Sequence, residues 1–236
     1  MRGIDIVDLQ TFFERRTGKI RLDILNPSWL YLSEGFRESA FRNLTKRVFD
    51  IASVAVLLPL ALPFVLLASV LILLESQGRG PILYRQTRVG QDGKLFQIYK
   101  FRTMVTDAEQ DGMARWAVED DPRITRAGAF LRKGRLDELP QLFNILKGDM
   151  SFVGPRPERP EFVEQLADSI PFYNERHRVK PGLTGWAQIN YPYGNTIEDA
   201  LQKLQYDLFY IKYQSAVFDL SILFNTVKTI LLRKGT

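Results

Sequence analysis

The chain has 236 residues, 45% of them hydrophobic and 25% charged, which is enough for one sizeable core and excludes a disordered or collagen-like protein. Its 32 Lys and Arg against 27 Asp and Glu give a net charge of +5, which favours anionic partners such as phosphates or acidic lipids. With no cysteine and His177 as its single histidine, the sequence excludes thiolate and zinc–sulfur chemistry and disfavours a Ser-His-Asp triad. Any catalysis must use carboxylates, amines or hydroxyls.

Residues 1–45 are polar and mixed, with a short helix predicted from Asp8 to Arg16 and a break at Pro27. Nothing in this segment suggests chemistry. We interpret it as an N-terminal extension or linker and expect it to continue a larger upstream region.

The segment from Val48 to Leu74 is apolar except for Asp50, and it is long enough for a membrane helix of about 20 residues. It starts too deep in the chain for a signal peptide. Basic residues just before it predict contact with anionic lipid on the cytoplasmic side: Arg42, Lys46 and Arg47. Pro59 and Pro63 leave two topologies open, a kinked helix that returns to the entry face and a helix that crosses the membrane.

A β-hairpin is predicted after this segment, because two strand-like runs flank the turn residues Gly90 to Gly93. The second run carries Lys100, which is either a phosphate ligand or part of a solvated basic edge. Residues 104–126 are loose and polar, with a helix predicted up to Val118.

Helices are predicted over the rest of the chain. One ends at Gly148 and has an apolar face of residues spaced i, i+3, i+4 and i+7: Leu139, Leu142, Phe143 and Leu146. Two further helices are expected from Glu161 to Asp168 and from Thr196 to Ile211. The run from Ala216 to Leu232 contains Asp219 and Lys228 and predicts an amphipathic helix on the domain or in the membrane surface.

The pair Asp137 and Glu138 opens the predicted helix that ends at Gly148, directly after Arg132, Lys133 and Arg135. Acidic residues at a helix start cap the backbone and complement the helix dipole, which is a purely structural interpretation. The same place suits phosphate chemistry, because helix amides and nearby cations hold anionic oxygens beside a carboxylate nucleophile or metal ligand. The two interpretations are compatible.

Three more residues are candidates for chemistry. Arg156 lies between two prolines that fix its backbone, so its guanidinium could bind a phosphate bidentately, although a turn with a solvated arginine has the same pattern. Lys180 begins a stiff, glycine-containing loop that forms either a phosphate cradle or a simple connection. Asp207 either caps local structure or supplies a third carboxylate. We expect His177 to do no more than pack or bond at the surface.

These pieces in this order resemble the bacterial sugar transferases that act on polyprenyl phosphate, the monotopic phosphoglycosyl transferases. The resemblance covers residues 46 to 234 and rests on KRVFD, YRQTRVG, YKFRTM, LDELPQLFNILKGDMSFVGPRP, KPGLTGWAQIN and YDLFYIK. It is strongest to the catalytic C-terminal part of the long, exopolysaccharide-type members.

The resemblance implies transfer of a sugar 1-phosphate from a nucleotide sugar, expected to be a UDP-sugar, to undecaprenyl phosphate with release of UMP. Asp137 would be the nucleophile that forms a phosphosugar intermediate, with Glu138 as metal partner or acid/base. Mg²⁺ is the implied cofactor, with Asp137, Glu138 and Asp207 as its ligands. The implied phosphate-binding residues are Lys100, Arg132, Arg156 and Lys180.

It also implies a fold of the α+β class, helix-rich, with a small β-hairpin, a proline-broken re-entrant membrane helix and interfacial amphipathic helices. The expected organisation is an extension over 1–45, a re-entrant helix over 46–75 broken at Pro63, and a catalytic domain over 76–236. That domain would face the cytoplasm at the bacterial inner membrane, in contact with membrane lipids, and would act in the first membrane step of exopolysaccharide, capsule or O-antigen synthesis. Pairing of two copies into a homodimer is left open.

The sequence departs from the family pattern in three places. Arg135 stands where many members have Ser, Lys180 stands where many have Arg, and Pro59 is an additional proline. Two other functions compete with the transferase. A non-catalytic, membrane-docked scaffold needs only the amphipathic segments and the positive charge. Nucleic-acid binding is disfavoured by the small net charge, the apolar helix and the lack of a recognisable motif.

Overall fold

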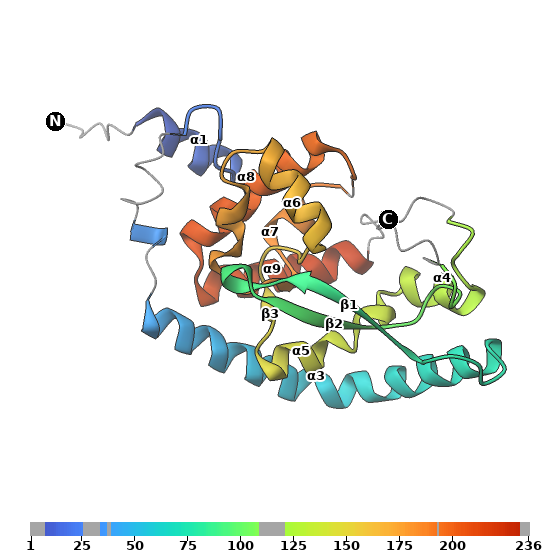
Figure 1. Cartoon of the computed structure of the whole chain (residues 1–236). Helices are drawn as coiled ribbons and strands as arrows, with labels where there is room; N and C mark the ends of the chain where they lie inside the picture. Colours follow the sequence, from blue (N-terminus) through green and yellow to red (C-terminus); the bar gives the residue numbers. More distant parts are fainter. Residues whose placement is uncertain (1–7, 26–33, 37–38, 109–120, 193, 232–236) are drawn as a thin grey trace.

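The structure is a computed structural model that describes residues 8–25, 34–36, 39–108, 121–192 and 194–231 (Figure 1). Its helices are α1 (Leu9–Thr17), α3 (Ala40–Glu75), α4 (Arg126–Lys133), α5 (Gln141–Lys147), α6 (Pro160–Ser169), α7 (Trp186–Asn190), α8 (Ile197–Tyr213) and α9 (Ala216–Leu231). Its strands are β1 (Leu83–Val89), β2 (Leu95–Phe101), β3 (Ser151–Val153) and β4 (Gly182–Thr184). Short 3₁₀ turns are η1 (Glu34–Phe36), η2 (Gln91–Gly93), η3 (Leu136–Glu138) and η4 (Tyr173–Arg178). The helix-rich α+β class predicted from the sequence is confirmed.

The predicted hairpin is present as the antiparallel pair β1 and β2, in register from Leu83 opposite Phe101 to Val89 opposite Leu95. Its turn is η2, where Asp92 and Gly93 have φ of 55° and 74°. Asp and Gly adopt this left-handed conformation more readily than other residues, so the turn forms from its own sequence.

The second sheet is the short parallel pair β3 and β4, which lies in the main core. Glycine is required where the chain enters β4, because a Cβ on Gly182 would lie 2.1 Å from the backbone nitrogen of Gly154, the residue after β3. The two segments therefore touch backbone to backbone, and this contact fixes the start of the loop that carries Arg156.

Helix α3 is unbroken from Ala40 to Glu75 and runs along one whole side of the domain, with a bend in its length (Figure 1). The predicted proline break is thus a bend within one helix, since the helix continues through both Pro59 and Pro63. One narrow stripe faces the domain: Asp50, Val54, Ala61, Ala68 and Ile72. Most of its other apolar side chains are exposed, and α3 is the one described helix long and apolar enough to cross a membrane.

The polar beginning of α3 is bonded to the core. The Lys46 ammonium lies 2.6 Å from Asp219 Oδ2 of α9 and also donates to the Val153 carbonyl oxygen at 2.9 Å. Asp50 Oδ1 accepts from Ser151 Oγ and from the Phe152 N–H of β3. The KRVFD motif therefore ties the apolar helix to the central strands.

The described part of the predicted N-terminal linker packs on the domain. Glu14 of α1 is buried and accepts from Lys212 and Tyr213 of α8, and Trp186 Nε1 donates to the Gly18 carbonyl. Residues 8–25 thus contribute to the main core, which includes Ile20.

The predicted apolar face of α5 is wrong in part. Phe143 is 58% exposed and Leu146 is also exposed, whereas Gln141 and Asn144 are buried. The reason is a tertiary contact: Asn144 Oδ1 accepts from Tyr99 N–H and Asn144 Nδ2 donates to the Gln97 carbonyl, so α5 turns its amide toward the edge of β2.

The other predicted helices are present as α1, α6, α8 and α9. On α9, the exposed apolar residues share one face: Val217, Leu220, Phe224 and Val227. The opposite face carries the buried Ile222 and Asp219. The helix expected up to Val118 extends into residues 109–120, which lie outside the described part.

Candidate active site

The pair Asp137 and Glu138 lies in the 3₁₀ turn η3, between α4 and α5. The turn forms because α4 ends at Gly134 and Arg135 then takes a left-handed conformation with φ of 54°. The carboxylates therefore precede α5, which begins at Gln141, by one tight turn rather than opening it. Both side chains are buried, with each residue 8% exposed.

Glu138 holds two of the predicted phosphate ligands. Its Oε1 lies 3.1 Å from Lys100 Nζ of β2 and 2.8 Å from Arg156 Nη2 in the loop after β3. Three segments that are far apart in the sequence thus meet at one carboxylate oxygen. Burial raises the pKa of Glu138, but the charges of Arg156 and Lys100 outweigh it and hold that pKa well below its usual range.

Asp137 is in the opposite situation. Among the described residues, its carboxylate accepts no hydrogen bond, although Lys100, Arg132 and Arg156 are close enough to attract it electrostatically. Burial and the neighbouring Glu138 charge raise the pKa of Asp137. In the part of the chain that the structure describes, this carboxylate is thus buried near three cations and has no hydrogen-bond partner.

The cations around the pair are held in place by the fold. Arg132 Nε donates to Thr103 Oγ1 at 2.9 Å, which fixes the guanidinium beside the end of β2. Burial lowers the pKa of Lys100, while the Glu138 charge acts in the other direction. An anionic ligand at Lys100 would likewise favour its charged form.

Asp207 does not join the carboxylate pair. Its Oδ2 accepts from Arg176 Nη2 at 2.9 Å and from Arg176 Nε at 3.2 Å, and both residues are buried. Arg176 Nη2 also donates to the Arg156 carbonyl oxygen at 3.0 Å. The structure thus places Asp207 on Arg176, which in turn holds the backbone of Arg156, and its metal role stays a prediction.

Lys180 lies at the far end of α5 from the pair. A Cβ on Gly148, which caps that end, would lie 3.5 Å from Lys180 Nζ and 3.7 Å from Arg47 Cζ. Burial, followed by the Arg47 charge, lowers the pKa of Lys180. The structure thus brings Lys100, Arg132 and Arg156 to the carboxylates and places Lys180 at the opposite end of α5, a helix about 10 Å long.

Two residues that the sequence did not single out shape this site. Arg176 positions the Arg156 loop, and Asn144 fixes the strand that carries Lys100. The sequence could have indicated a role for Asn144, because this polar residue interrupts the apolar pattern of its helix. No feature of the local sequence indicates the role of Arg176.

The pair can accommodate a hard divalent cation. Within the described residues no group of three or more Asp, Glu or His side chains gathers, so a cage of protein ligands is not built there. Mg²⁺ usually takes only one or two carboxylates and completes its shell with substrate phosphates and water. The unbonded Asp137 carboxylate and the second oxygen of Glu138 fit that pattern.

Comparison with known proteins places the chain among relatives with named activities. It is 42% identical over 232 residues to the UDP-N-acetylgalactosamine-undecaprenyl-phosphate N-acetylgalactosaminephosphotransferase of Aeromonas hydrophila, covering 98% of this chain and 53% of the relative. It is 44% identical over 191 residues to the UDP-glucose:undecaprenyl-phosphate glucose-1-phosphate transferase of Escherichia coli K12, covering 80% of this chain and 40% of the relative. It is 54% identical over 131 residues to a putative undecaprenyl-phosphate N-acetylgalactosaminyl 1-phosphate transferase of Bacillus subtilis, covering 56% and 72%.

The chain spans about half the length, or less, of the first two of these relatives. The family model described as bacterial sugar transferase matches residues 41–233, which include α3 from its second residue, both sheets and every residue of the site above. The chain belongs to the bacterial sugar transferase family.

Proposed function

We propose that this protein transfers a sugar 1-phosphate from a nucleotide sugar, in the first instance a UDP-sugar, to undecaprenyl phosphate through a covalent intermediate on Asp137. The names of the relatives, which combine nucleotide sugars with undecaprenyl phosphate, support the choice of substrates. The observation that carries the mechanism is a contrast between two adjacent carboxylates. One oxygen of Glu138 binds two cations, whereas Asp137 accepts no hydrogen bond from the residues that the structure describes.

In the first step an Asp137 oxygen attacks the phosphorus that bears the sugar. The bond from that phosphorus to the bridging oxygen breaks, the electron pair leaves with UMP, and an aspartyl-phosphosugar remains. Lys100, Arg132 and Arg156 surround the position where charge develops on the diphosphate. Mg²⁺ held by Asp137 and Glu138 would neutralise the diphosphate and stabilise the leaving group.

In the second step a phosphate oxygen of undecaprenyl phosphate attacks the same phosphorus. The bond to the Asp137 oxygen breaks, which regenerates the carboxylate and gives undecaprenyl diphosphate sugar. Glu138 keeps Lys100 and Arg156 in place through both steps, because one of its oxygens binds both cations.

The acceptor is a membrane lipid, and α3 supplies the membrane contact in this proposal. The domain packs along the length of α3, from the Lys46–Asp219 pair at its start to the bonds from the N–H groups of Arg126 and Ala127 to Glu75 at its end. A polar domain that holds both ends of the helix favours a helix that enters and leaves on one face, which we propose is the cytoplasmic face of the inner membrane. The exposed side of α3 and the apolar face of α9 would then lie against lipid.

The covalent step is tested with donor alone. Purified protein with Mg²⁺ and a panel of radiolabelled UDP-sugars is expected to release up to one UMP per protein and to retain the labelled phosphosugar, in the absence of lipid acceptor. Asp137→Asn is expected to lose both, and removal of Mg²⁺ by EDTA to suppress both reversibly. Asp92→Asn is a matched control, because Asp92 lies in the distant hairpin turn and Asn tolerates its left-handed conformation.

The competing function is a non-catalytic membrane-docked scaffold. It predicts that Asp137→Asn and Glu138→Gln change neither membrane binding nor the output of the assembly. UMP release that requires the acceptor, or that persists in Asp137→Asn, would contradict the covalent mechanism.

A further inference from the structure

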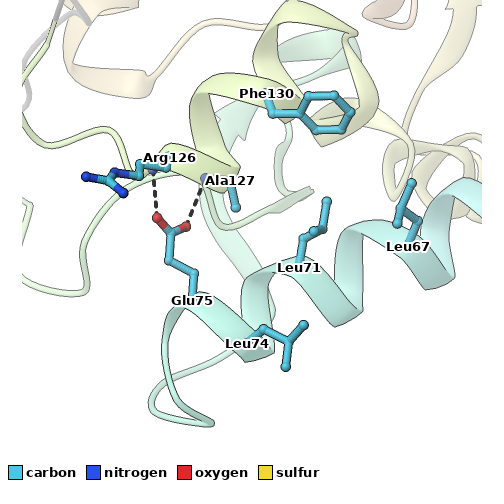
Figure 2. Close-up of a pocket in the computed structure, with 7 residues that line it drawn as sticks. All are labelled: Leu67, Leu71, Leu74, Glu75, Arg126, Ala127 and Phe130. Carbon is cyan, nitrogen blue, oxygen red and sulfur yellow. Dashed lines mark hydrogen bonds between the residues drawn. The ribbon is translucent and has the colours of Figure 1, made fainter.

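An apolar hollow lies between the last turns of α3 and the outer side of α4, away from the carboxylate pair. It has a volume of about 540 Å³ and is lined by Leu67, Leu71, Leu74, Glu75, Arg126, Ala127 and Phe130 (Figure 2). We call it the α3–α4 groove. It is open to the surroundings along its length, and its walls are almost entirely hydrocarbon.

The groove is continuous with the exposed apolar side of α3. Leu67 and Leu74 belong to that side, and Phe130 of α4 is also largely exposed. From Leu67 to Leu74 the groove follows α3 for about 10 Å, which is the length of a short stretch of hydrocarbon chain. Apolar walls of this kind, on a segment that we place against lipid, fit a hydrocarbon chain better than a polar ligand.

At the Glu75 end of the groove, the rim carries the side chain of Arg126. The Glu75 carboxylate is occupied by the backbone N–H groups of Arg126 and Ala127, at 2.8 and 2.9 Å. Figure 2 shows the Arg126 guanidinium directed away from that carboxylate. Among the residues that the structure describes, the Arg126 side chain has no hydrogen-bond or ion-pair partner.

The apolar walls of the groove and the charge of Arg126 at its rim together indicate what the groove binds. We infer that the α3–α4 groove holds one acyl chain of an anionic membrane phospholipid, with the lipid phosphate paired to Arg126. This inference rests on the membrane contact of α3 in the proposed function. The charge of Arg126 at a lipid surface favours an anionic headgroup over a zwitterionic one.

The position of the groove argues against the lipid acceptor in its reacting pose. Arg132, whose charge acts on Asp137, follows Phe130 by two positions, a rotation of about 200° around α4. The groove and the carboxylate pair are thus on opposite sides of this helix. A lipid phosphate bound at Arg126 would therefore belong to a lipid held in the α3–α4 groove, and not to a substrate aligned with Asp137.

Photo-crosslinking tests the inference on the full chain in nanodiscs. Phosphatidylglycerol and phosphatidylcholine, each with a photoactivatable acyl chain, are compared, and the labelled peptides are mapped. We expect phosphatidylglycerol to label the groove residues preferentially. Arg126→Gln should reduce that preference about fivefold, the effect of one basic residue near an anionic surface.

Two further variants distinguish the effect of the Arg126 charge on lipid labelling from the effect of the space in the groove. Lys133→Gln removes a cation from the other end of the same helix and should leave the preference unchanged. Ala127→Trp fills the groove and should reduce labelling there by both lipids, while labelling elsewhere on α3 persists.

Three outcomes would overturn the inference: equal labelling of the groove by both lipids, a preference that survives Arg126→Gln, and displacement of phosphatidylglycerol from the groove by equimolar undecaprenyl phosphate. If the exposed side of α3 is labelled throughout but the groove is not preferred, the groove proposal alone fails. If α3 is not labelled at all, the proposed membrane contact fails as well.

Discussion

At the scale of single residues, some side chains of the site are placed to bind substrate phosphates, and others hold those side chains in position. Glu138 and Asp207 are both buried carboxylates that accept from arginine, yet only Glu138 lies beside Asp137. Asp207 acts on the site through Arg176 and the Arg156 carbonyl.

Asp207→Asn is therefore expected to destabilise the fold by about 3 kcal/mol, because it leaves the Arg176 charge buried without its partner. Chemical denaturation in detergent measures this loss. Asp137→Asn is the comparison variant, and we expect it to match or exceed the wild-type stability, since it removes a buried charge that Glu138 repels. Equal destabilisation by the two variants would contradict the different roles assigned to them.

His177 provides a pH-dependent prediction. Burial and then the Arg176 charge lower the pKa of His177 to about 4, and the ring also lies against Tyr173. Between about pH 6.5 and 4 the unfolded chain binds a proton that the folded protein does not, so stability falls as the pH is lowered through this window. From pH 7 to pH 5 the contribution is about 2 kcal/mol.

Denaturation of the wild type and of His177→Gln at pH 7 and pH 5 isolates this effect, because the two proteins share every other titratable group. The variant is expected to lose about 2 kcal/mol less than the wild type over that interval. An identical pH response of the two proteins would mean that His177 protonates as readily in the folded state as in the unfolded state.

At the scale of elements, the contact between α5 and β2 decides the geometry of the site. The side chain of Asn144 takes the place of a neighbouring strand, with bonds of 3.0 Å from Tyr99 N–H and 2.7 Å to the Gln97 carbonyl. Lys100 directly follows Tyr99, so this helix–strand contact sets where its ammonium meets Glu138.

Asn144→Ala is expected to cost about 2–3 kcal/mol, since it leaves two backbone groups of β2 without partners. It should also lower kcat, because Lys100 loses its support. Asn144→Asp retains an acceptor for Tyr99 N–H and removes the donor to the Gln97 carbonyl. We expect it to lower the free energy of unfolding by at least the contribution of that one hydrogen bond. Denaturation, combined with steady-state UMP release in the presence of donor and undecaprenyl phosphate, measures both effects. Wild-type kcat in a destabilised Asn144→Ala would show that the contact is structural alone.

At the scale of the whole molecule, the domain and α3 form one body along the length of the helix (Figure 1). The buried stripe of α3 is narrow, and the rest of its apolar surface is exposed. An exposed apolar surface of this size is unfavourable in water. Contact of the buried stripe with the domain and of the exposed side with lipid accounts for both faces of α3.

The absence of cysteine makes the topology directly measurable. Single substitutions Ser39→Cys and Arg79→Cys place one thiol before α3 and one after it, and Leu66→Cys places one on its exposed side. In sealed vesicles with the cytoplasmic face outward, a membrane-impermeant maleimide is expected to label both end positions and to leave position 66 protected. Labelling of the two ends from opposite sides of the membrane would establish a crossing helix.

The sequence alone determined the features that depend on neighbouring residues: the apolar length of α3, the hairpin at Gly90 to Gly93, most helix positions, and the place of the carboxylate pair after a basic helix. Periodicity, caps and turn residues encode these locally. Only the tertiary structure decided that Asp207 binds Arg176, that Lys180 lies away from the pair, and that α5 buries Asn144 while exposing Phe143. Each of these depends on which segments, distant in the chain, dock together, and a buried polar group takes whichever partner that docking brings within hydrogen-bond distance.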